Sequence, residues 1–544
     1  MQPGYLRGNR HEIKIIMTGE INMSVSKLEI NLGTLLEKSA SKHKDKIALY
    51  FHHEAESITF EQLNKRVNQF ANALKNQGIQ NGDHVAVMLP NCPEFLYIWL
   101  ALAKLGAVMI PLNNGYQAKD LEYILANSDS SALIIQDTFT SRFREAQGNT
   151  PKIKKIFIIG KAQDDLGEVL PTLAVSESDT FHTSNINVSR DDLMNIQYTS
   201  GTTGLPKGCM LTHEYWMLLG GSVAELMNDK DVFLCVTPFY YMDPQWELIM
   251  CLTAGCTMVI TRKYSASRYM KWINQYKVTV SWATMAAWTL KQPESEYDKN
   301  HKLRFLFVGA FPPELQKEFE NRFSVKIREA FGMTEIGPGM FVPLEDDHMT
   351  GSGSVGKPLE IRKVKIVDQT GSEVSQGETG ELWVTGPGML LGYYKNPEAT
   401  ARIFENKWFK TGDLFKQDEN GYFYIVGRIK DMIRRSGENI SAKEVENVLN
   451  SHPRIKSAAV IAVPDESRGE EVKAYIIPAD KETSETIPPN TIIEYCSERI
   501  AQFKLPRYIE YKEAFPSTPT GKIQKHLLIT EKEDLSSGCF DRTA

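Results

Sequence analysis

Apolar residues in the first part of the chain repeat alternately at helical and at strand spacing. A capping box formed by Thr59 and Gln62 precedes a helical repeat of apolar residues that runs from Phe60 to Leu74. Short apolar runs then predict strands at 85–89, 107–111, 132–135 and 153–159, with an apolar helix over 94–105. Strands and helices that alternate at this spacing are typical of α/β units built on a parallel sheet.

The same alternation continues beyond residue 230 and then changes. The predicted strands there are 232–236, 257–260, 278–281 and 305–309, with helices between them. The runs at 361–368 and 380–385 are typical of antiparallel strands bounded by turns. From about residue 430, a unit of about 115 residues has its own strand and helix pattern, a size that suits an independent domain. We therefore expect an α/β fold: a large N-terminal domain with parallel sheets and a β-subdomain, and a small α+β C-terminal domain.

Length and composition agree with this organisation and exclude several classes of protein. The expected segments are a disordered extension at 1–22, a large domain at 23–429 and a small mobile domain at 430–544. A net charge of −6 argues against a nucleic-acid binder, and seven cysteines without CxxC or zinc spacing are expected to be reduced thiols. No apolar run is long enough to span a membrane, and residues 1–22 lack a secretory signal. We therefore expect a cytoplasmic protein with no integral membrane segment.

A polar run between residues 198 and 208 carries the clearest sign of chemistry. Its hydroxyl side chains, glycines and single cation are Thr199, Ser200, Gly201, Thr202, Thr203, Gly204 and Lys207. Glycines let backbone N–H groups turn toward an anion, and hydroxyls and a lysine add donors and charge. A strand is predicted to end near Gln197, and Thr212 is placed to cap a helix that begins near Glu214. We interpret the run as a phosphate-binding loop between a strand and a helix.

The alternatives for this run are a Walker A loop and a flexible linker. A Walker A loop needs four residues between its glycines and then Gly-Lys-Ser or Gly-Lys-Thr, whereas here Lys207 is followed by Gly208. A run rich in glycine, serine and threonine is also typical of a flexible linker. The patterned segments on both sides favour the phosphate-binding loop.

The loop resembles the signature loop of the adenylate-forming enzymes, which include acyl-CoA synthetases, luciferases and the adenylation domains of peptide synthetases. Further fragments resemble motifs of this family in the family's order: Gly309-Ala310-Phe311-Pro312, Phe331-Gly332-Met333-Thr334-Glu335, Thr411-Gly412-Asp413, Arg428, Ser436-Gly437-Glu438-Asn439 and Thr520-Gly521-Lys522. Each fragment alone is equally compatible with an ordinary surface turn. Their common order indicates membership, and the resemblance covers roughly residues 32 to 528.

The resemblance implies how ATP is bound. The adenine is expected to stack on Phe331, next to Gly332 and Met333 and beside the loop at 309–311. The ribose hydroxyls are expected to be bound by Asp413, since a carboxylate accepts two hydrogen bonds, with Arg428 as a second contact.

The resemblance also implies the residues that carry the chemistry. A carboxylate oxygen attacks the α-phosphorus of ATP and pyrophosphate leaves, so charge develops that fixed donors, a cation and Mg²⁺ must stabilise. Thr334 is expected to meet the phosphate, and Thr199 and Glu335 to hold Mg²⁺. Lys522 is expected to bridge carboxylate and phosphate, which makes Lys522, Thr199 and Glu335 the predicted catalytic residues.

A second half-reaction, with CoA, is implied by the C-terminal motifs. Ser436, Gly437 and Glu438 resemble the turn that lines the pantetheine channel. Lys430 occupies the family's hinge position, about which the small domain rotates so that first Lys522 and then this turn faces the site.

The acyl pocket is predicted from the aromatic and acidic residues that follow Pro238. The expected lining residues are Tyr240, Tyr241, Asp243, Trp246 and Trp282, and Glu247 is expected to add a second carboxylate. Tyr241 stands where most family members have histidine, the residue that tends to gate acyl entry. Aromatic faces near carboxylates suit a quaternary ammonium group, although a plain apolar acyl chain is the commoner occupant of such walls.

The predicted activity is an ATP-dependent acyl-CoA ligase, with ATP, Mg²⁺ and CoA as cosubstrates and a small carboxylic acid as substrate. Met242-Asp243-Pro244-Gln245 and the stretch from 291 to 304 are similar to crotonobetaine/carnitine–CoA ligases, which implies a betaine-type acid. The alternatives are a medium- or long-chain fatty acid, an enzyme that loads a carrier protein, and a nucleotide-binding regulator without catalysis. No nucleic-acid partner is expected, and a homodimer is the candidate assembly.

Overall fold

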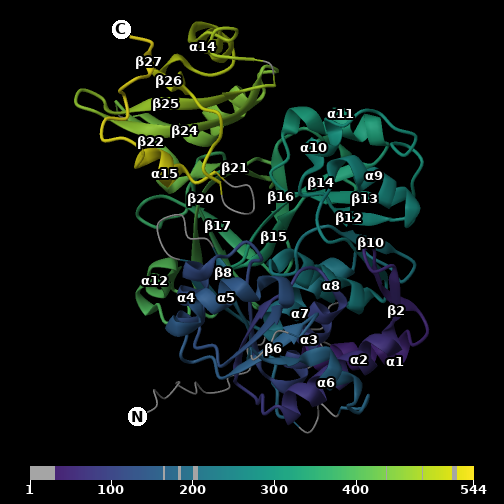
Figure 1. The fold of residues 1–544 in the computed structure, drawn as a ribbon. Helices are drawn as coiled ribbons and strands as arrows, with labels where there is room; N and C mark the ends of the chain where they lie inside the picture. Colours follow the sequence, from purple (N-terminus) through teal and green to yellow (C-terminus); the bar gives the residue numbers. More distant parts are fainter. Residues whose placement is uncertain are drawn as a thin grey trace.

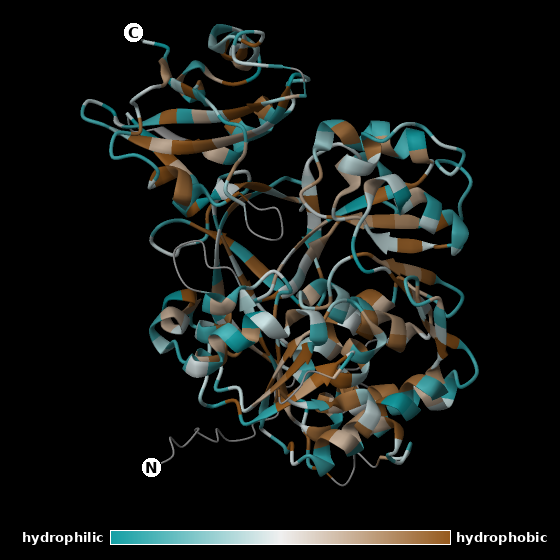
Figure 2. Ribbon diagram, viewed as in Figure 1, coloured by the Kyte–Doolittle hydropathy of each residue, from teal (hydrophilic) through white to brown (hydrophobic). Residues whose placement is uncertain are grey.

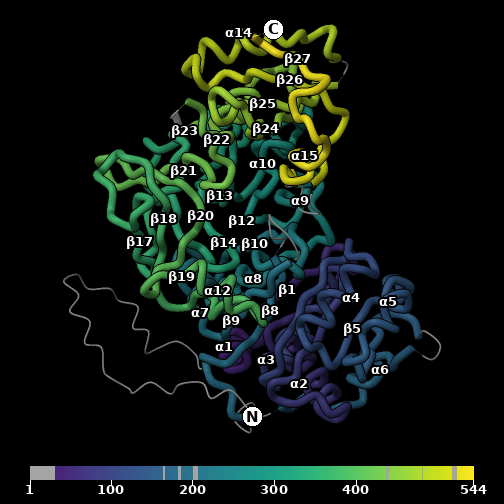
Figure 3. The backbone as a smooth tube through the Cα atoms, turned by 90° about the vertical axis from the view of Figure 1, so that its left-hand side faces the viewer, coloured from purple at the N-terminus to yellow at the C-terminus, as the bar shows by residue number. Residues whose placement is uncertain are grey.

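The computed structural model describes residues 31–162, 166–181, 186–199, 206–436, 438–480, 482–517 and 523–543. The strands of these residues form three sheets. Figure 1 shows the sheet of the C-terminal part above two larger lobes, and Figure 3 shows that strands β17 to β21 lie on one side of the lobe that contains β5 and α2 to α6.

The first sheet carries the predicted phosphate-binding loop at one edge. Its strand order is β7 (Glu168–Val169), β6 (Lys155–Ile159), β5 (Ala132–Gln136), β3 (His84–Met88), β4 (Val108–Pro111), β8 (Leu193–Thr199) and β9 (Lys207–Thr212). Its helices are α1 (Leu32–Lys42), α2 (Phe60–Asn76), α3 (Pro93–Leu105), α4 (Ala118–Asn127), α5 (Thr140–Ala146) and α6 (Leu170–Val175). The strands from β7 to β8 pair in parallel, as the alternating pattern predicted. The predicted capping box of α2 is present, because Thr59 and Gln62 bond to each other's backbone.

One local prediction for this sheet was wrong. Residues 207–212 form the strand β9, which pairs antiparallel with β8, so the loop joins two strands and not a strand and a helix. The helix α7 (His213–Ala224) follows directly, and its N-cap is Thr212 as predicted, with the side chain accepting from the Tyr215 N–H. The glycines near Thr199 and Gly208 favoured a loop in the sequence analysis. From Lys207 onward, however, the backbone N–H and C=O groups pair with β8, which satisfies their hydrogen bonds.

The second sheet joins a parallel part to an antiparallel part. The parallel strands are β1 (Ile47–Phe51), β11 (Thr257–Ile260), β10 (Val232–Cys235), β12 (Val280–Trp282), β13 (Phe305–Val308) and the start of β14 (Lys326–Met333). The antiparallel strands are β2 (Glu56–Thr59), β15 (Gly337–Phe341), β16 (Ser354–Pro358), β17 (Lys363–Val367), β18 (Gly380–Thr385), β19 (Phe404–Glu405), β20 (Trp408–Gln417) and β21 (Phe423–Arg428). Its helices are α7, α8 (Met242–Ala254), α9 (Ala266–Gln275), α10 (Ala286–Leu290), α11 (Pro313–Phe323) and α12 (Pro397–Ile403).

The C-terminal part has a sheet of its own. Its strands are β22 (Met432–Arg435), β23 (Glu438–Ser441), β24 (Ile455–Asp465), β25 (Gly469–Pro478), β26 (Tyr508–Tyr511) and β27 (Phe540–Asp541), with helices α13 (Ala442–Asn450), α14 (Pro489–Ser497) and α15 (Lys525–Ile529). Its buried residues form separate clusters from those of the rest of the chain. The molecule is therefore an α/β protein with a large N-terminal and a smaller C-terminal part, while the boundary at 429/430 stays a prediction.

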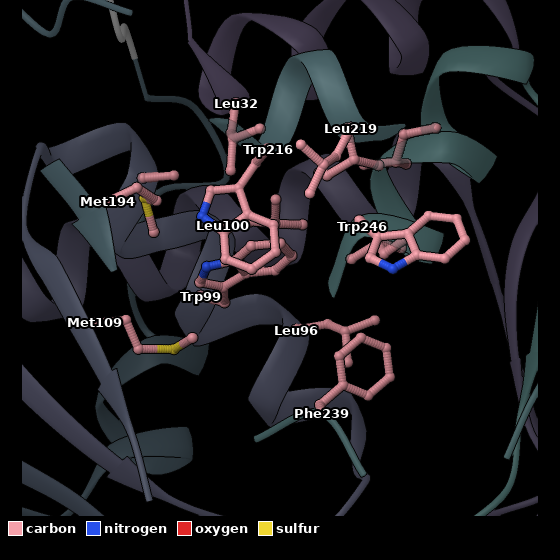
Figure 4. Packing of buried hydrophobic residues seen from close by; sticks show 14 of the residues in the cluster. Leu32, Leu96, Trp99, Leu100, Met109, Met194, Trp216, Leu219, Phe239 and Trp246 are labelled. Atoms are coloured by element: carbon pink, nitrogen blue, oxygen red, sulfur yellow. The ribbon is translucent and has the colours of Figure 1, made fainter. Parts of the chain in front are cut away.

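The largest core lies between the first two sheets. Figure 4 shows Trp99 of α3, Trp216 of α7 and Trp246 of α8 close together, with Phe239 below them. The rings of Trp99 and Trp216 meet edge to face at 5.5 Å, and both are fully buried. Figure 2 shows hydrophobic residues along the strands inside the lobes and hydrophilic residues on the outer faces of the helices. This packing fixes α7 and α8 against the sheets, and both helices border the site described next. Within the described ranges, every helix is too short or too polar to cross a membrane.

Candidate active site

A cavity of about 920 Å³ opens where the two large sheets meet. Its walls come from the ends of β8, β10, β12 and β13, from β14, and from helices α7 and α8. Ligands of open α/β sheets bind at the carboxyl ends of the parallel strands, because the loops that follow the strands converge there. The cavity therefore lies where this topology places a ligand.

The nucleotide end of the cavity collects most of the predicted ATP-binding residues. The lining includes Thr199, Gly309, Ala310, Phe331, Gly332, Met333 and Thr334. The ring of Phe331 packs edge to face on Phe415 at 5.0 Å, which holds it in place. Ala310 adopts a left-handed backbone with φ 55°, and the adjacent Phe311 N–H donates to Glu329 at 3.3 Å. Phe311 itself points its ring at Phe319, away from the cavity.

The base of the predicted phosphate-binding loop is described, whereas Ser200, Gly201, Thr202, Thr203 and Gly204 lie outside the described residues. Thr199 and Lys207 are opposite each other in the β8–β9 pair. The Lys207 ammonium lies 5.0 Å from the centre of the Tyr393 ring, and the Tyr393 hydroxyl donates to Glu335 at 2.8 Å. Lys207, Tyr393 and Glu335 thus form one cluster next to the start of the loop, although Glu335 is not part of the cavity lining.

The donor set at Thr199 and Glu335 fits a magnesium ion. Glu335 is half-buried, and the side-chain partner described for it is a neutral hydroxyl, so its charge is not neutralised by a cation. Mg²⁺ binds to one or two carboxylates together with substrate phosphates and water. A threonine hydroxyl is a Mg²⁺ ligand in other phosphate-binding loops, and Thr199, which begins this loop, would supply one here.

The two predicted ribose contacts are paired with each other. Asp413 and Arg428 face one another in the β20–β21 ladder, and their side chains form an ion pair at 2.7 Å. Asp413 is nearly buried, while the Arg428 side chain is 32% exposed. Neither residue of the pair is part of the cavity lining, whereas Ile425, three residues before Arg428 on β21, is.

All five residues predicted for the acyl pocket line the cavity. Tyr240 and Tyr241 follow β10 and meet edge to face at 4.6 Å, and Trp246 of α8 meets Trp282 of β12 edge to face at 5.9 Å. Asp243 lies in the first turn of α8, between these two aromatic pairs along the chain. The exposed residues Lys263 and Trp288 also belong to the lining.

Two carboxyl groups of the lining have raised pKa values. Burial raises the pKa of Asp243 to about 6, although a hydrogen bond with Trp246 opposes this. Burial likewise raises the pKa of Glu329 to about 7, against hydrogen bonds from the backbone of Phe311 and Ala310. Neither carboxyl group forms an ion pair within the described part of the chain. Both would gain stability from a cation in the cavity.

Glu329 was missed by the sequence analysis, and Glu247 was wrongly expected in the pocket. Glu329 shares a face of β14 with Phe331, and its place two residues before the aromatic residue of the adenine motif was the available signal. Glu247 is fully buried, outside the lining, and neither carboxyl oxygen has a hydrogen-bond partner. Burial first, and then Asp243, raise its pKa well above the ordinary value.

The C-terminal motifs are described only in part. Lys522 and Gly437 lie outside the described residues. Ser436 has a left-handed backbone with φ 50°, and Glu438 begins β23. Lys430 lies in the short helical turn Ile429–Asp431 between β21 and β22, which joins the second sheet to the third.

Comparison with known proteins agrees with this arrangement. The family of AMP-binding enzymes matches residues 36–394, and the C-terminal domain of AMP-binding enzymes matches residues 444–522. Crotonobetaine/carnitine–CoA ligases of Proteus mirabilis and Salmonella paratyphi A are 33% and 34% identical to the chain, covering 91% of it and 98% of each relative.

Solved structures of similar fold extend over nearly the whole chain. The anthranilate CoA ligase AuaEII in complex with anthranoyl-AMP has a TM-score of 0.85 and 27% identity, covering 94% of this chain and 99% of that one. ATP-bound MatB from Rhodopseudomonas palustris has a TM-score of 0.83 and 26% identity, with 93% and 100% covered. The cavity at the sheet ends and these matches show that the chain belongs to the AMP-binding enzyme family and is an acid–thiol ligase of the adenylate-forming acyl-CoA synthetase type.

Proposed function

We propose that this ligase activates a short carboxylic acid that carries a trimethylammonium group, such as crotonobetaine, carnitine or γ-butyrobetaine, and transfers it to CoA. The acid first displaces pyrophosphate from ATP to give an acyl-adenylate, and the thiol of CoA then displaces AMP. The relatives named for crotonobetaine and carnitine support this substrate class.

The observation that carries the proposal is the charge of the acyl end of the cavity. Asp243 lines the mainly apolar and aromatic acyl end, and no ion pair to it occurs within the described part of the chain. Burying an unpaired carboxylate is unfavourable, as the raised pKa values show, so the empty cavity is suited to a positive ligand. The indole rings of Trp246 and Trp282 add cation–π attraction of roughly 0.5–2 kcal/mol per ring.

The proposed roles at the nucleotide end follow from the same cavity. Phe331 stacks on the adenine beside the loop at 309–311, and Asp413 with Arg428 binds the ribose at the rim. Thr199 and Glu335 would hold Mg²⁺, which neutralises the phosphate charge that develops as pyrophosphate leaves. Lys522 is proposed to supply the cation between carboxylate and phosphate, and rotation about Lys430 to bring the 436–438 turn to the site for the CoA step.

Acid-dependent release of pyrophosphate and AMP tests this proposal. A panel should include the three betaines, straight-chain acids of several lengths and an aromatic acid, each with and without CoA. We expect the betaines to give the highest kcat/KM, with acyl-CoA as the product when CoA is present. Highest activity on a straight-chain acid would reject the betaine assignment, and transfer only to a carrier protein would reject CoA as the acceptor.

A further inference from the structure

The order of the strands arranges the cavity lining from the nucleotide end outward. The neighbouring strands β14, β13, β12, β10 and β11 pair in parallel, so their carboxyl ends lie at one edge of the sheet. In that order, the lining includes Phe331, Gly309, Trp282, Tyr240 and Lys263. Neighbouring strands are about 4.8 Å apart, so Lys263 lies roughly 19 Å across the sheet from the strand that carries Phe331.

At this far end the cavity meets solvent. Lys263 is exposed and Trp288 of α10 is 59% exposed, although both belong to the lining. Nearer the nucleotide end, Trp246 is buried and Trp282 is half-buried. The cavity therefore has an opening beyond the acyl pocket. We call it the outer mouth, and its lining residues are Lys263, Tyr264, Met285 and Trp288.

Hydrogen bonds between three loops fix the backbone of the outer mouth. The Asn91 amide donates to Thr237 O in the loop after β10 and to Thr261 O in the loop after β11, each at 2.9 Å. The Tyr264 hydroxyl donates to Met285 O at 2.9 Å, which joins the loop after β11 to the segment after β12. The mouth is therefore held in one arrangement before a ligand enters it.

The outer mouth and the acyl pocket carry opposite charges. Asp243 lies in the first turn of α8, which follows β10, whereas Lys263 follows β11, one strand further out. Its neighbour Arg262 is paired with Glu54 at 2.7 Å, but no ion pair to the Lys263 ammonium occurs among the described residues. The positive charge of Lys263 is therefore available to act on a ligand group at the mouth.

We propose that Lys263 is a specificity-determining residue that disfavours an ammonium group and favours a carboxylate at the far end of a longer acid. The proposal deepens the proposed function and rests on it, because it assumes that a carboxylic acid is activated at the nucleotide end. A short betaine places its ammonium group at Asp243. An acid longer by one strand spacing, about 5 Å, places its terminal group at Lys263. Betaines are therefore accepted up to a limiting length, beyond which a terminal carboxylate is preferred.

The exposure of Lys263 determines the size of this effect and its response to salt. Interactions between exposed charges change a binding equilibrium by up to about fivefold, because water screens them. Dissolved salt weakens them further, whereas it acts much less on a buried group. Discrimination at the outer mouth is therefore modest and sensitive to salt.

A matched series of acids tests the charge at the outer mouth. At each of several chain lengths, from that of γ-butyrobetaine upward, the terminal group is trimethylammonium, its uncharged carbon isostere or a carboxylate, and kcat/KM is measured in ATP–pyrophosphate exchange. In the wild type, we expect the ratio of betaine to isostere to fall with length and the ratio of dicarboxylate to isostere to rise. For the long acids, Lys263→Met should raise the first ratio and lower the second, each about fivefold, because it removes the charge. Lys263→Glu should reverse both preferences.

Lys271→Met is the matched control. Lys271 is an exposed lysine of α9 that lies outside the cavity lining, so every ratio should stay as in the wild type. In the wild type, the ratios for the long acids should approach one as salt is raised from about 0.01 M to about 1 M. A purely steric role of Lys263 would not produce this dependence on salt.

The same ratios for the long acids in Lys263→Met and in the wild type would overturn the proposal. So would long acids that neither react nor compete with the fastest acid, because the outer mouth would then lie beyond the reach of a substrate. Failure of the betaine assignment is seen separately, at the shortest length, where γ-butyrobetaine would react no faster than its isostere in the wild type.

Discussion

The residues that line the cavity fall into two groups, one at a nucleotide end and one at an acyl end. At the nucleotide end, Phe331 and the 309–311 loop offer an aromatic face and backbone groups. At the acyl end, Asp243 offers negative charge among indole and phenol rings, whereas Glu329 lies beside the 309–311 loop. On the proposed function, Asp243 and the indole rings together favour a cationic acid over an uncharged one of equal shape.

The Asp243→Asn variant should lose selectivity for a betaine. We expect the ratio of kcat/KM for γ-butyrobetaine to that for the uncharged isostere, in which carbon replaces nitrogen, to fall about tenfold, because the amide removes the charge at constant shape. Glu329→Gln should leave this ratio nearly unchanged, because Glu329 lies beside the 309–311 loop at the nucleotide end. Glu247→Gln is the matched control, since this carboxyl lies outside the cavity lining. A ratio that is the same in Asp243→Asn and in the wild type would contradict this assignment.

The same two carboxyls should make the stability of the ligand-free protein depend on pH. Their pKa values are raised on folding, from 3.8 to about 6 for Asp243 and from 4.5 to about 7 for Glu329. The folded protein therefore holds more protons than the unfolded chain between about pH 4 and 7, and the free energy of unfolding falls as the pH rises through this window.

The double variant Asp243→Asn, Glu329→Gln should be less sensitive to pH. Compared with the wild type, we expect it to be more stable at pH 8 by about 1–3 kcal/mol, since one pKa unit corresponds to about 1.4 kcal/mol and water in the cavity screens part of the effect. Denaturant unfolding at pH 5 and pH 8 without ligand measures this. Parallel pH dependence in both proteins would show that other groups determine it.

Residue types alone identified the aromatic lining but not the direction of every side chain. Asp243 and Glu247 are four residues apart on α8, and both were expected in the acyl pocket. Asp243 is at the first turn, where the helix borders the cavity, whereas Glu247 is further along and is buried beside Cys235, outside the lining. The packing of α8 on the sheet decides this, and helical spacing by itself does not.

Among the secondary-structure elements, the β8–β9 hairpin and the helix α7 support the phosphate-binding loop. β8 leads into the loop at Thr199, β9 leads out of it at Lys207, and α7 begins at the end of β9. The Thr212 side chain caps α7 by accepting from the Tyr215 N–H at 3.2 Å. The loop is therefore anchored on both sides by bonded backbone.

Thr212→Ala should weaken this anchor. Loss of the cap leaves an N–H of the first helical turn without its partner and should lower the free energy of unfolding by about 1 kcal/mol, and Thr212→Ser should restore most of it. Urea unfolding of the three proteins measures the difference. Equal losses in the alanine and serine variants would indicate that the threonine methyl group, and not the hydroxyl, is responsible.

The periodicity of the chain predicted most elements of the parallel sheets, because buried strands and amphipathic helices have distinct spacing. The strand β9 was missed, since its run Lys207-Gly208-Cys209 adjoins a glycine-rich loop and has no alternation of its own. Its pairing with β8 is a tertiary effect. The ion pair between Asp413 and Arg428 could likewise not be predicted from the sequence, because the two residues come together only through the β20–β21 register.

For the whole molecule, we propose that the C-terminal part moves relative to the large part, so that two half-reactions can use one cavity. The connection runs through Ile429–Asp431, and the third sheet shares no strand with the second.

We propose that Lys522 serves adenylation only. Lys522→Ala should therefore lose ATP–pyrophosphate exchange by several orders of magnitude, because it removes the cation at the reacting oxygens. The same variant, supplied with acyl-adenylate and CoA, should still form the thioester, whereas equal loss of both half-reactions would contradict a rotating C-terminal domain.

Gly437→Leu is the complement of that variant. If the 436–438 turn lines the pantetheine channel, the added side chain should block transfer to CoA and leave adenylate formation near normal. Rates of the two half-reactions, together with the melting temperature, measure this. A drop in melting temperature with loss of both steps would mean that the glycine only maintains a turn.

The central claim, a ligase for trimethylammonium acids, is tested most directly by comparing γ-butyrobetaine with its uncharged carbon isostere in ATP–pyrophosphate exchange by the wild-type protein. The two acids have the same shape and the same reacting carboxylate, so their difference isolates the charge recognised by the acyl end of the cavity. We predict a kcat/KM at least tenfold higher for the betaine. An equal or higher kcat/KM for the uncharged acid would contradict the claim.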